Sequence, residues 1–306
     1  MAVKRVLITG GTGILGKALM EDCPAGIQVF TTYIRDCWGR DLPCPARKLD
    51  ITNRKDTLRA ISEWARPDVV IHAAGIGNVD FAENNRTVAR KIIVGGTANV
   101  IAACRRNDVK LIYISSNAVF DGGHPPYAED SERLPVNYYG RLKVQAEDLV
   151  MNSGLKYAIV RAILMYGWHF PYSRSNPVTH WLRLLSEGKP VNVVTDRYSQ
   201  PLFAEDCAKI IWEIVKKDKG GIYHVSGADR LSLFDFAKKT AEIFGFDKRL
   251  IKPVASSYFP ELAPRPVDTS FLTAKIKKEM KTRPRGIKEG LQRMKATSLD
   301  AHQNDV

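Results

Sequence analysis

A glycine-rich stretch near the N-terminus constrains the fold of this chain more than any other feature. Residues Val3 to Gly16 read VKRVLITGGTGILG: a short apolar run, closely spaced glycines, and then apolar residues at helical spacing. Gly11, Gly13 and Gly16 fit G-x-G-x-x-G, and Gly10, Gly13 and Gly16 fit G-x-x-G-x-x-G. A Cβ here would block the turn and the approach of a pyrophosphate to N–H groups at the helix start. The stretch therefore predicts a strand, a tight turn and a helix that bind a dinucleotide.

Strands and helices alternate through the rest of the first half. Apolar runs typical of strands cover 27–33, 48–51, 68–75, 110–116 and 157–161, and helical spacing covers 54–65 and 86–107. This alternation predicts an α/β fold, an open, doubly wound parallel sheet of the Rossmann type with helices on both faces. The run DVVIHAAG at 68–75 indicates a strand buried on both faces, and we interpret His72 within it as a core histidine.

The composition limits which kinds of binding partner and which cellular compartment are expected for this chain. The net charge of +13 suits an enzyme of phosphorylated ligands, and without a nucleic-acid module we expect no nucleic-acid partner. Five cysteines without C-x-x-C or metal spacing indicate the reducing cytoplasm and no metal centre. The first strand begins close to the N-terminus, and no apolar run approaches the ~20 residues of a membrane span. Neither a signal peptide nor a membrane helix is expected.

The end of the second strand bears on the choice of cofactor. An acid there binds the ribose 2′-hydroxyl of NAD, whereas an arginine accommodates the 2′-phosphate of NADP. Arg35 follows the strand at once, and Asp36 lies about the right distance beyond the glycines for NAD. NADP is therefore preferred, and NAD stays open. Asp50, in the next short strand, could reach an adenine amino group or cap a helix.

A serine pair and a tyrosine–lysine pair are the candidate chemical groups. Ser115 and Ser116 stand at the carboxyl end of a predicted strand, where ligands bind in open α/β sheets. Tyr139 and Lys143 are four residues apart on a predicted helix, so they would face the same site. A cation beside a phenol lowers the pKa of the phenol and makes it a usable acid or base near neutral pH. The pattern predicts proton transfer by Tyr139, with Ser116 holding the substrate oxygen.

Together these motifs resemble an extended short-chain dehydrogenase/reductase. More extensive matches are to its dTDP-4-dehydrorhamnose reductase branch, with an RmlD-like substrate-binding domain. The matching segments are SSNAVFDG at 115–122, PVNYYG at 135–140, DRYSQP at 196–201 and APRP at 263–266. The β subunit of methionine adenosyltransferase is similar to this branch in fold and motifs.

The resemblance implies hydride transfer between a nicotinamide and the C4 keto group of a nucleotide-activated deoxy sugar. Tyr139 would protonate the forming alkoxide, Lys143 would lower the pKa of that tyrosine and bind the nicotinamide ribose, and Ser116 would polarise the carbonyl. Cofactor contacts are expected from Gly10, Thr12, Gly13, Ile14, Gly16, Arg35, Asp50, Ile51, Ala73, Ala74, Gly75, Ser115, Tyr139 and Lys143. Substrate contacts are expected from Asn117, Arg161, Arg197, Gln200 and Arg265, since a planar guanidinium suits a pyrophosphate.

The same resemblance implies a two-part architecture. A Rossmann domain of residues 1–167, completed by 202–226, would bind NADP. A smaller C-terminal α/β lobe, 168–201 and 227–294, would bind the nucleotide sugar, and 295–306 would form a flexible tail. A homodimer would form through the helices around 85–107 and 139–152.

Three positions depart from the family pattern. Ile93 stands where the superfamily often has an active-site asparagine, Leu164 replaces a tryptophan of the sugar pocket, and Asn117-Ala118 replaces Asp-Tyr. Two alternatives stay open. One is an epimerase or dehydratase with bound NAD, although dehydratases need an acid–base pair that Asn117-Ala118 does not supply. The other is a non-catalytic, NADP-binding regulatory subunit.

Overall fold

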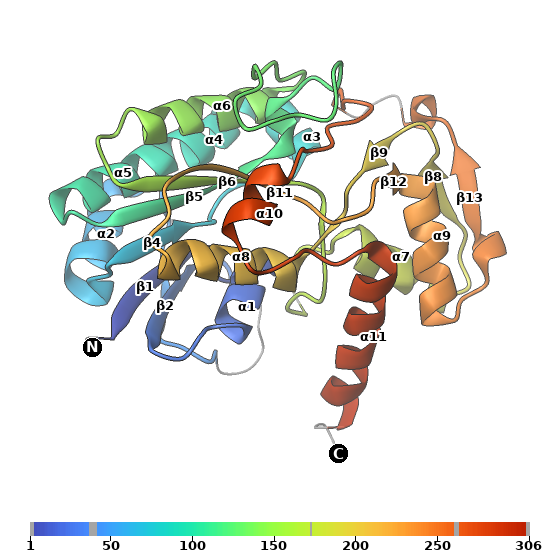
Figure 1. Ribbon diagram of the computed structural model, residues 1–306, viewed down its shortest axis with the longest axis horizontal. Helices are drawn as coiled ribbons and strands as arrows, with labels where there is room; N and C mark the ends of the chain where they lie inside the picture. Colours follow the sequence, from blue (N-terminus) through green and yellow to red (C-terminus); the bar gives the residue numbers. More distant parts are fainter. Residues whose placement is uncertain (1–2, 37–41, 172, 260–262, 304–306) are drawn as a thin grey trace.

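A seven-stranded parallel sheet forms the centre of the computed structural model, which describes residues 3–36, 42–171, 173–259 and 263–303 (Figure 1). The strand order is β11-β6-β5-β4-β1-β2-β3, and each neighbouring pair is parallel. The strands are β1 Lys4–Thr9, β2 Ile27–Tyr33, β3 Ala46–Lys48, β4 Val69–His72, β5 Lys110–Ser116, β6 Tyr157–Ala162 and β11 Gly221–Val225. The predicted doubly wound α/β fold is confirmed.

Helices cover both faces of this sheet (Figure 1). Against one face pack α1 (Ile14–Glu21), α8 (Ala204–Lys216) and α10 (Ala274–Glu279), through a core that includes Leu19, Ile211 and Ile276. The other face carries α2 (Arg54–Arg59), η1 (Ala60–Ala65), α3 (Val79–Asn84), α4 (Arg86–Arg90), η2 (Lys91–Gly95), α5 (Gly96–Arg106) and α6 (Tyr138–Met151). Of these, η1 and η2 are π-helical turns inside longer helices.

The strand order reverses between β1 and β4. From β1 the chain passes outward to β2, and from β4 it passes to β5 on the opposite side. In open α/β sheets such a reversal opens a crevice at the carboxyl ends of the strands, and ligands bind there. The glycine turn that follows β1 lies at this point.

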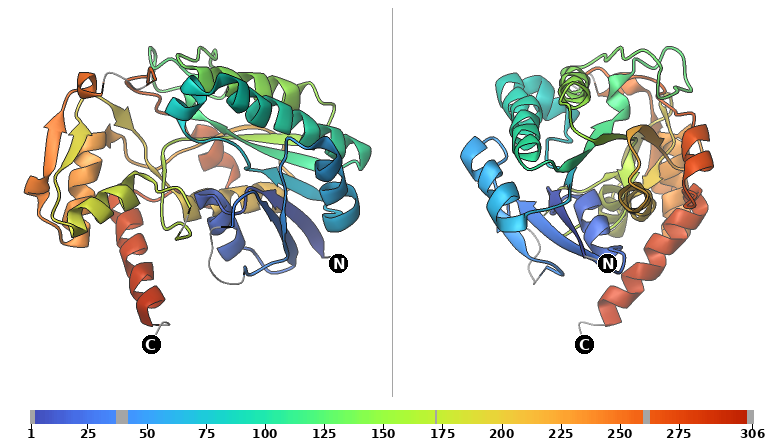
Figure 2. Two further views of the ribbon diagram at one scale, coloured as in Figure 1. Left: turned by 180° about the vertical axis from the view of Figure 1, so that it is seen from behind. Right: turned by 60° about the vertical axis from the view of Figure 1, so that its left-hand side comes forward.

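A second core lies beyond one end of the sheet (Figure 2). It is built by α7 (Pro177–Ser186), α9 (Leu233–Phe244) and α11 (Ile287–Gln303) around the parallel pair β8 (Val191–Val194) and β13 (Ile251–Val254). Trp181, Phe236 and Leu291 are among its buried side chains. Two short pairs connect this lobe to the sheet: β7 (Met165–Tyr166) with β10 (Leu202–Phe203), and β9 (Tyr198–Ser199) with β12 (Leu231–Ser232). Short helical turns complete the chain: η3 Asn117–Val119, η4 Lys248–Leu250 and η5 Ser256–Tyr258.

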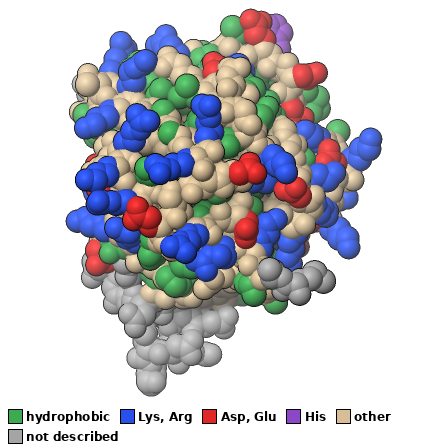
Figure 3. All heavy atoms as spheres, turned by 90° about the vertical axis from the view of Figure 1, so that its left-hand side faces the viewer, with side chains coloured by type: hydrophobic (Ala, Val, Ile, Leu, Met, Phe, Trp, Pro, Cys, Tyr) green, Lys and Arg blue, Asp and Glu red, His purple; other side chains and the backbone are tan. Residues whose placement is uncertain are grey.

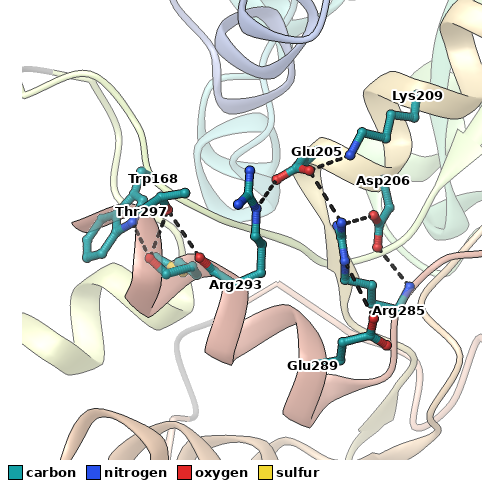
Figure 4. Close-up of polar contacts among 9 residues, drawn as sticks. Trp168, Glu205, Asp206, Lys209, Arg285, Glu289, Arg293 and Thr297 are labelled. Carbon is teal, nitrogen blue, oxygen red and sulfur yellow. Dashed lines mark hydrogen bonds and ion pairs between the residues drawn. The ribbon is translucent and has the colours of Figure 1, made fainter. Parts of the chain in front are cut away.

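Ion pairs join the sheet-covering helix α8 to α11 and to Arg285, which lies just before α11 (Figure 4). Arg285 contacts Asp206 at 2.5 Å and Glu205 at 3.4 Å, and Arg293 contacts Glu205 at 3.3 Å. Trp168 Nε1 donates to the carbonyl of Met294 at 2.7 Å. The last helix is therefore anchored both to α8 and to the segment after β7.

Part of the expected flexible tail at 295–306 is helical, because α11 continues as far as Gln303. Leu291 and Met294 are fully buried, and the Thr297 hydroxyl donates to the Met294 carbonyl at 2.9 Å, so the helical pattern runs on past residue 294. Residues 304–306 lie outside the described part.

The strand expected at 48–51 is also displaced, since β3 ends at Lys48. The Asp50 carboxylate accepts the Thr52 N–H at 2.9 Å, and the Asp50 carbonyl accepts the Asn53 N–H at 3.0 Å. These bonds turn the chain into α2, whose N-cap is Asn53, instead of extending the strand.

One helical segment, Arg86–Arg106, is long and apolar enough by length and composition to cross a membrane, which the sequence analysis did not anticipate. In the fold it lines the core, where Ile93, Val100 and Cys104 are buried.

Lys and Arg side chains are spread over the face drawn in Figure 3, with carboxylates and uncharged groups between them.

Candidate active site

The glycine turn after β1 forms a cradle that only glycine fits. Gly10 has a φ of +79°, and a Cβ on it would lie 2.7 Å from the backbone of Ala74. A Cβ on Gly16 would lie 2.5 Å from the Cα of Gly11. Gly13 differs, since a Cβ there would meet only the Gly10 carbonyl at 3.4 Å. The turn is therefore tight where it packs against β4 and the helix, and open on the side of Gly13.

That open side exposes the N-terminus of α1. Its N-cap is Gly13, which has no side chain to accept a hydrogen bond, and no acid lies in the first turn. Free N–H groups and the positive end of the helix dipole favour an anion at this point. Thr12, Gly13 and Ile14 thus lie where a dinucleotide pyrophosphate would be bound, and the cradle fits that group.

The other expected cofactor residues lie at or after the ends of strands β2 to β5. After β4, the N–H groups of Ala73 and Ala74 bond to Thr9 at 3.1 and 3.3 Å, which brings that loop, ending in Gly75, beside the glycine turn. Ser115 is buried, and its hydroxyl has no hydrogen-bond partner within the described segments. On the side of the sheet formed by β2 and β3, Arg35 is exposed shortly after β2 ends. Ile51 is buried against Gly96. Asp50 is exposed, and its carboxylate caps the turn described above.

Helix α6 brings the tyrosine and the lysine to the end of β5. Asn137 caps this helix by accepting the Gly140 N–H at 2.8 Å. Gly140 allows close packing, because a Cβ there would lie 2.1 Å from the Ala118 carbonyl. The Tyr139 phenol consequently lies close enough to Ser116 for that hydroxyl to lower its pKa, and Lys143 Nζ is 5.9 Å from the centre of the Tyr139 ring. The Ser116 hydroxyl itself donates to Asn117 Oδ1 at 3.2 Å and accepts the Ala118 N–H at 3.2 Å. Ser116, Tyr139 and Lys143 are brought together as the sequence predicts.

The pKa values of the pair differ from the expectation. Burial raises the pKa of Tyr139 above its ordinary value, while the bond to Ser116 and the charge of Arg174 act in the opposite direction. Burial lowers the pKa of Lys143 to about 8, partly offset by the Glu147 carboxylate. The expected net lowering of the Tyr139 pKa is therefore wrong for this geometry, because desolvation exceeds the stabilisation of the phenolate.

Arg161 does not reach the site, contrary to expectation. It is 1% exposed, and its Nε and Nη2 donate to the two carboxylate oxygens of Glu147 at 2.9 and 2.8 Å. Its Nη1 donates to the Glu129 carbonyl and lies 3.2 Å from His224 Nε2. Because Nε, Nη1 and Nη2 of the guanidinium all have partners inside the fold, Arg161 is a structural residue and does not bind substrate.

Gln200 is likewise engaged in the fold. Its Oε1 accepts the Phe271 N–H at 2.7 Å, and its Nε2 lies 3.4 Å from the Phe271 carbonyl. The expectation that Gln200 contacts substrate is corrected, since both ends of the amide hold the segment before α10. Asn117, the residue after Ser116, donates its Nδ2 to the Thr269 hydroxyl at 2.5 Å.

Three arginines, Arg174, Arg197 and Arg265, lie close enough to interact electrostatically with one another or with Asp80. Arg265 pairs with Asp80 at 2.6 Å. Arg197 is partly buried, and both burial and the charge of Arg265 lower its pKa. Arg174, which the sequence analysis missed, lies beside Gly77 and acts electrostatically on Asp80 and Tyr139. No motif surrounds Arg174 in the sequence, so only the fold reveals it. The arrangement favours an anionic ligand.

His72 is the core histidine that the sequence predicts. It is 1% exposed, its two ring nitrogens lie 2.7 and 3.2 Å from the hydroxyls of Thr9 and Thr97, and burial lowers its pKa to about 3. Within the described ranges no group of three His, Cys, Asp or Glu side chains could hold a metal ion.

Comparisons with known proteins extend over the sheet and the lobe. The family model described as RmlD substrate binding domain matches residues 4–299. The dTDP-4-keto-6-deoxy-D-glucose reductase of Streptomyces niveus is 30% identical over 271 residues, 85% of this chain and 86% of that protein. The methionine adenosyltransferase 2 subunit beta of Rattus norvegicus is 27% identical over 261 residues, 83% of this chain and 76% of that protein. A crystal structure of dTDP-4-dehydrorhamnose reductase from Bacillus anthracis in complex with NADP has a TM-score of 0.85 and 31% identity, and the match covers 96% of this chain and 99% of that one.

Proposed function

The chain belongs to the RmlD substrate-binding family, and on this premise we propose that it is an NADP-dependent reductase of a nucleotide-activated keto deoxy sugar. One observation supports the proposal: Ser116 at the end of β5 lies close enough to Tyr139 to act on its pKa, and Lys143 Nζ is 5.9 Å from the Tyr139 ring centre. The glycine cradle of residues 10–16 lies in the crevice at the same edge of the sheet. These groups are what reduction of a carbonyl by a bound nicotinamide requires.

The roles of the residues follow from their positions. Bound NADPH would supply the hydride for the C4 carbonyl carbon of the sugar. The Ser116 hydroxyl would donate a hydrogen bond to the carbonyl oxygen, and Tyr139, kept protonated by its raised pKa, would give that oxygen a proton. Lys143 would keep a positive charge beside the developing oxyanion. Arg197, Arg265 and Arg174 would hold the diphosphate of the nucleotide sugar.

We propose the domain division to be a cofactor part, 1–167 with 202–226, and a substrate part, 168–201 with 227–294. The separate cores of the sheet and of the lobe support it. The substrate would lie between the two, where the three arginines come from the lobe side and the tyrosine from the sheet side.

The direct test is a reductase assay. Purified protein with NADPH is expected to lose absorbance at the nicotinamide band when dTDP-4-keto-6-deoxy sugars are added, with slower loss with NADH because Arg35 favours the 2′-phosphate. Tight NADPH binding with no turnover on a panel of keto sugar nucleotides would instead favour a regulatory subunit, the role that the similarity to the beta subunit suggests. Stoichiometric NAD released on denaturation would favour an epimerase.

The pH dependence of this reduction should show the titration of Lys143. Its pKa is lowered to about 8, so the ammonium charge is lost as the pH rises through 8, while Tyr139 keeps its proton to higher pH. We expect kcat/KM, which reports groups of the free enzyme, to fall above about pH 8. Lys143→Arg, whose charge persists, should remove this fall even if its rate is lower. A profile that stays level to about pH 10 would contradict the assignment.

We further propose a homodimer and a cytoplasmic location. Val88 on α4 and Leu149 on α6 are 47% and 37% exposed, and a groove between these helices is lined by Val94 and Tyr138, which supports association through this face. A particle of one 34.2 kDa chain in light scattering would contradict the dimer. Cys23, Cys44, Cys104 and Cys207 are free thiols, which suits a reducing compartment. Disulfides in protein purified from its source without reductant would contradict it.

A further inference from the structure

A buried chain of polar side chains leads away from Lys143 into the core. Lys143 Nζ donates to the phenol oxygen of Tyr113 at 3.1 Å and to the Ile114 carbonyl at 2.8 Å. The Thr97 hydroxyl on α5 lies close enough to the Tyr113 phenol to lower the pKa of that phenol. Thr97 in turn reaches His72, which reaches Thr9 at the end of β1. All four core side chains are at most 2% exposed.

The protons of this chain have one consistent arrangement. The Thr97 hydroxyl donates to the Ile93 carbonyl at 2.6 Å, so its oxygen accepts from His72 Nε2. His72 Nδ1 then accepts from the Thr9 hydroxyl at 2.7 Å, whose oxygen accepts the Ala74 N–H. The phenol oxygen of Tyr113 accepts from Lys143 Nζ, because an ammonium group can only donate. Because buried polar groups are costly when unpaired, these hydrogen bonds resist reorientation.

We propose that Tyr113 is the residue that positions Lys143, and that Thr97 and His72 hold Tyr113 in the orientation that does so. Two of the three Nζ protons are then bound by the protein, and the third is left to point toward Tyr139 and a bound ribose. The Ile93 side chain is apolar, and only its backbone carbonyl takes part in these hydrogen bonds. The Tyr113 phenol therefore supplies Lys143 with a polar contact that the Ile93 side chain cannot give. The inference rests on the proposed function for its catalytic meaning, but not for its geometry.

The charged and titratable groups around Lys143 allow a defined test. Tyr113 faces it from β5, His72 from β4, and Tyr139 and Glu147 from its own helix. Glu147 is also paired with Arg161 and Arg133. A change of Tyr113 alters only one of these contacts, whereas a general loosening of the core would disturb them all.

Tyr113→Phe is the decisive variant, because it removes one oxygen and keeps the ring. Losing one acceptor of a buried ammonium group should lower the pKa of Lys143 by about one unit. From a starting value of about 8, the charged fraction then falls about twofold at pH 7 and about tenfold at pH 9. We expect NMR of lysine-labelled protein without ligand to show this shift at Lys143 Nζ, with the Lys143 signal assigned from Lys143→Met. The alkaline limb of kcat/KM should move by the same amount.

Further variants separate positioning from a structural effect. Tyr223→Phe removes the hydroxyl of another buried sheet tyrosine, bonded to Glu279 at 3.1 Å, and should leave the Lys143 titration unchanged. Thr97→Val should shift it partly, Thr97→Ser should restore it, and Thr97→Val combined with Tyr113→Phe should equal Tyr113→Phe alone. An unshifted Lys143 signal in Tyr113→Phe, or an equal shift in Tyr223→Phe, overturns the proposal. The NMR result stands even if no sugar nucleotide is reduced, so its failure is distinct from failure of the proposed function.

Discussion

Tyr139→Phe is expected to lower kcat for reduction of a keto sugar nucleotide by about 10²–10⁴-fold, because the substitution removes the proton donor. The ring stays in its packed position, 8% exposed at the end of the sheet, so the fold and the glycine cradle should be preserved. NADPH affinity should therefore change little. Steady-state rates and a fluorescence titration of NADPH on the same preparation would measure both quantities.

The neighbouring tyrosine offers a matched control. Tyr138 lies on the same turn of α6, but its ring stacks near Arg86 and the residue four positions on is Leu142 and not a lysine. Tyr138→Phe should keep a rate within about twofold of the parent, as a surface substitution does. Equal loss in both variants would mean that the helix start had been disturbed, and parent-like rates in Tyr139→Phe would exclude Tyr139 as the acid.

The sequence predicts the parts of this site that depend on local pattern. The strands at 27–33 and 110–116 have the predicted bounds, because each contains a central run of apolar or β-branched residues buried on both faces. The glycine turn and the Tyr139 to Lys143 spacing also follow from local rules. Parallel strands bring their carboxyl ends to one edge, so these separate motifs meet without any further information.

What the sequence does not reveal depends on contacts between distant segments. Arg161 and Arg174 are both single arginines without a motif, yet the fold pairs one with Glu147 of α6 and brings the other near enough to act electrostatically on Tyr139. The sign of the Tyr139 pKa shift depends on how completely the phenol is buried, which spacing on a helix cannot give. Tyr113 and Thr97 come from β5 and α5, and nothing in their local sequence links them to Lys143.

The largest change in stability is expected when Glu147 loses its charge. Glu147 is fully buried and binds both Nε and Nη2 of Arg161, whose side chain is also buried. Glu147→Ala would leave that guanidinium charge inside the fold with only neutral partners, the Glu129 carbonyl and His224. Breaking a buried pair in this way costs about 3–5 kcal/mol. Urea unfolding at neutral pH should show a loss of this size.

Asp148, the acid next to Glu147, provides a control for the loss of stability expected in Glu147→Ala. Asp148 pairs with Arg133 at 2.7 Å but is 45% exposed, so Asp148→Asn should cost no more than about 1 kcal/mol. Removing both buried charges with Glu147→Gln and Arg161→Met should recover much of the stability lost in Glu147→Ala, since no unpaired charge then remains. That double variant should also bind nucleotide sugar as the parent does. A large rise in the KM for the nucleotide sugar alone would mean that Arg161 binds substrate after all. Unchanged substrate binding with altered unfolding would instead mean that the Glu147–Arg161 pair stabilises α6, the helix that carries Tyr139 and Lys143.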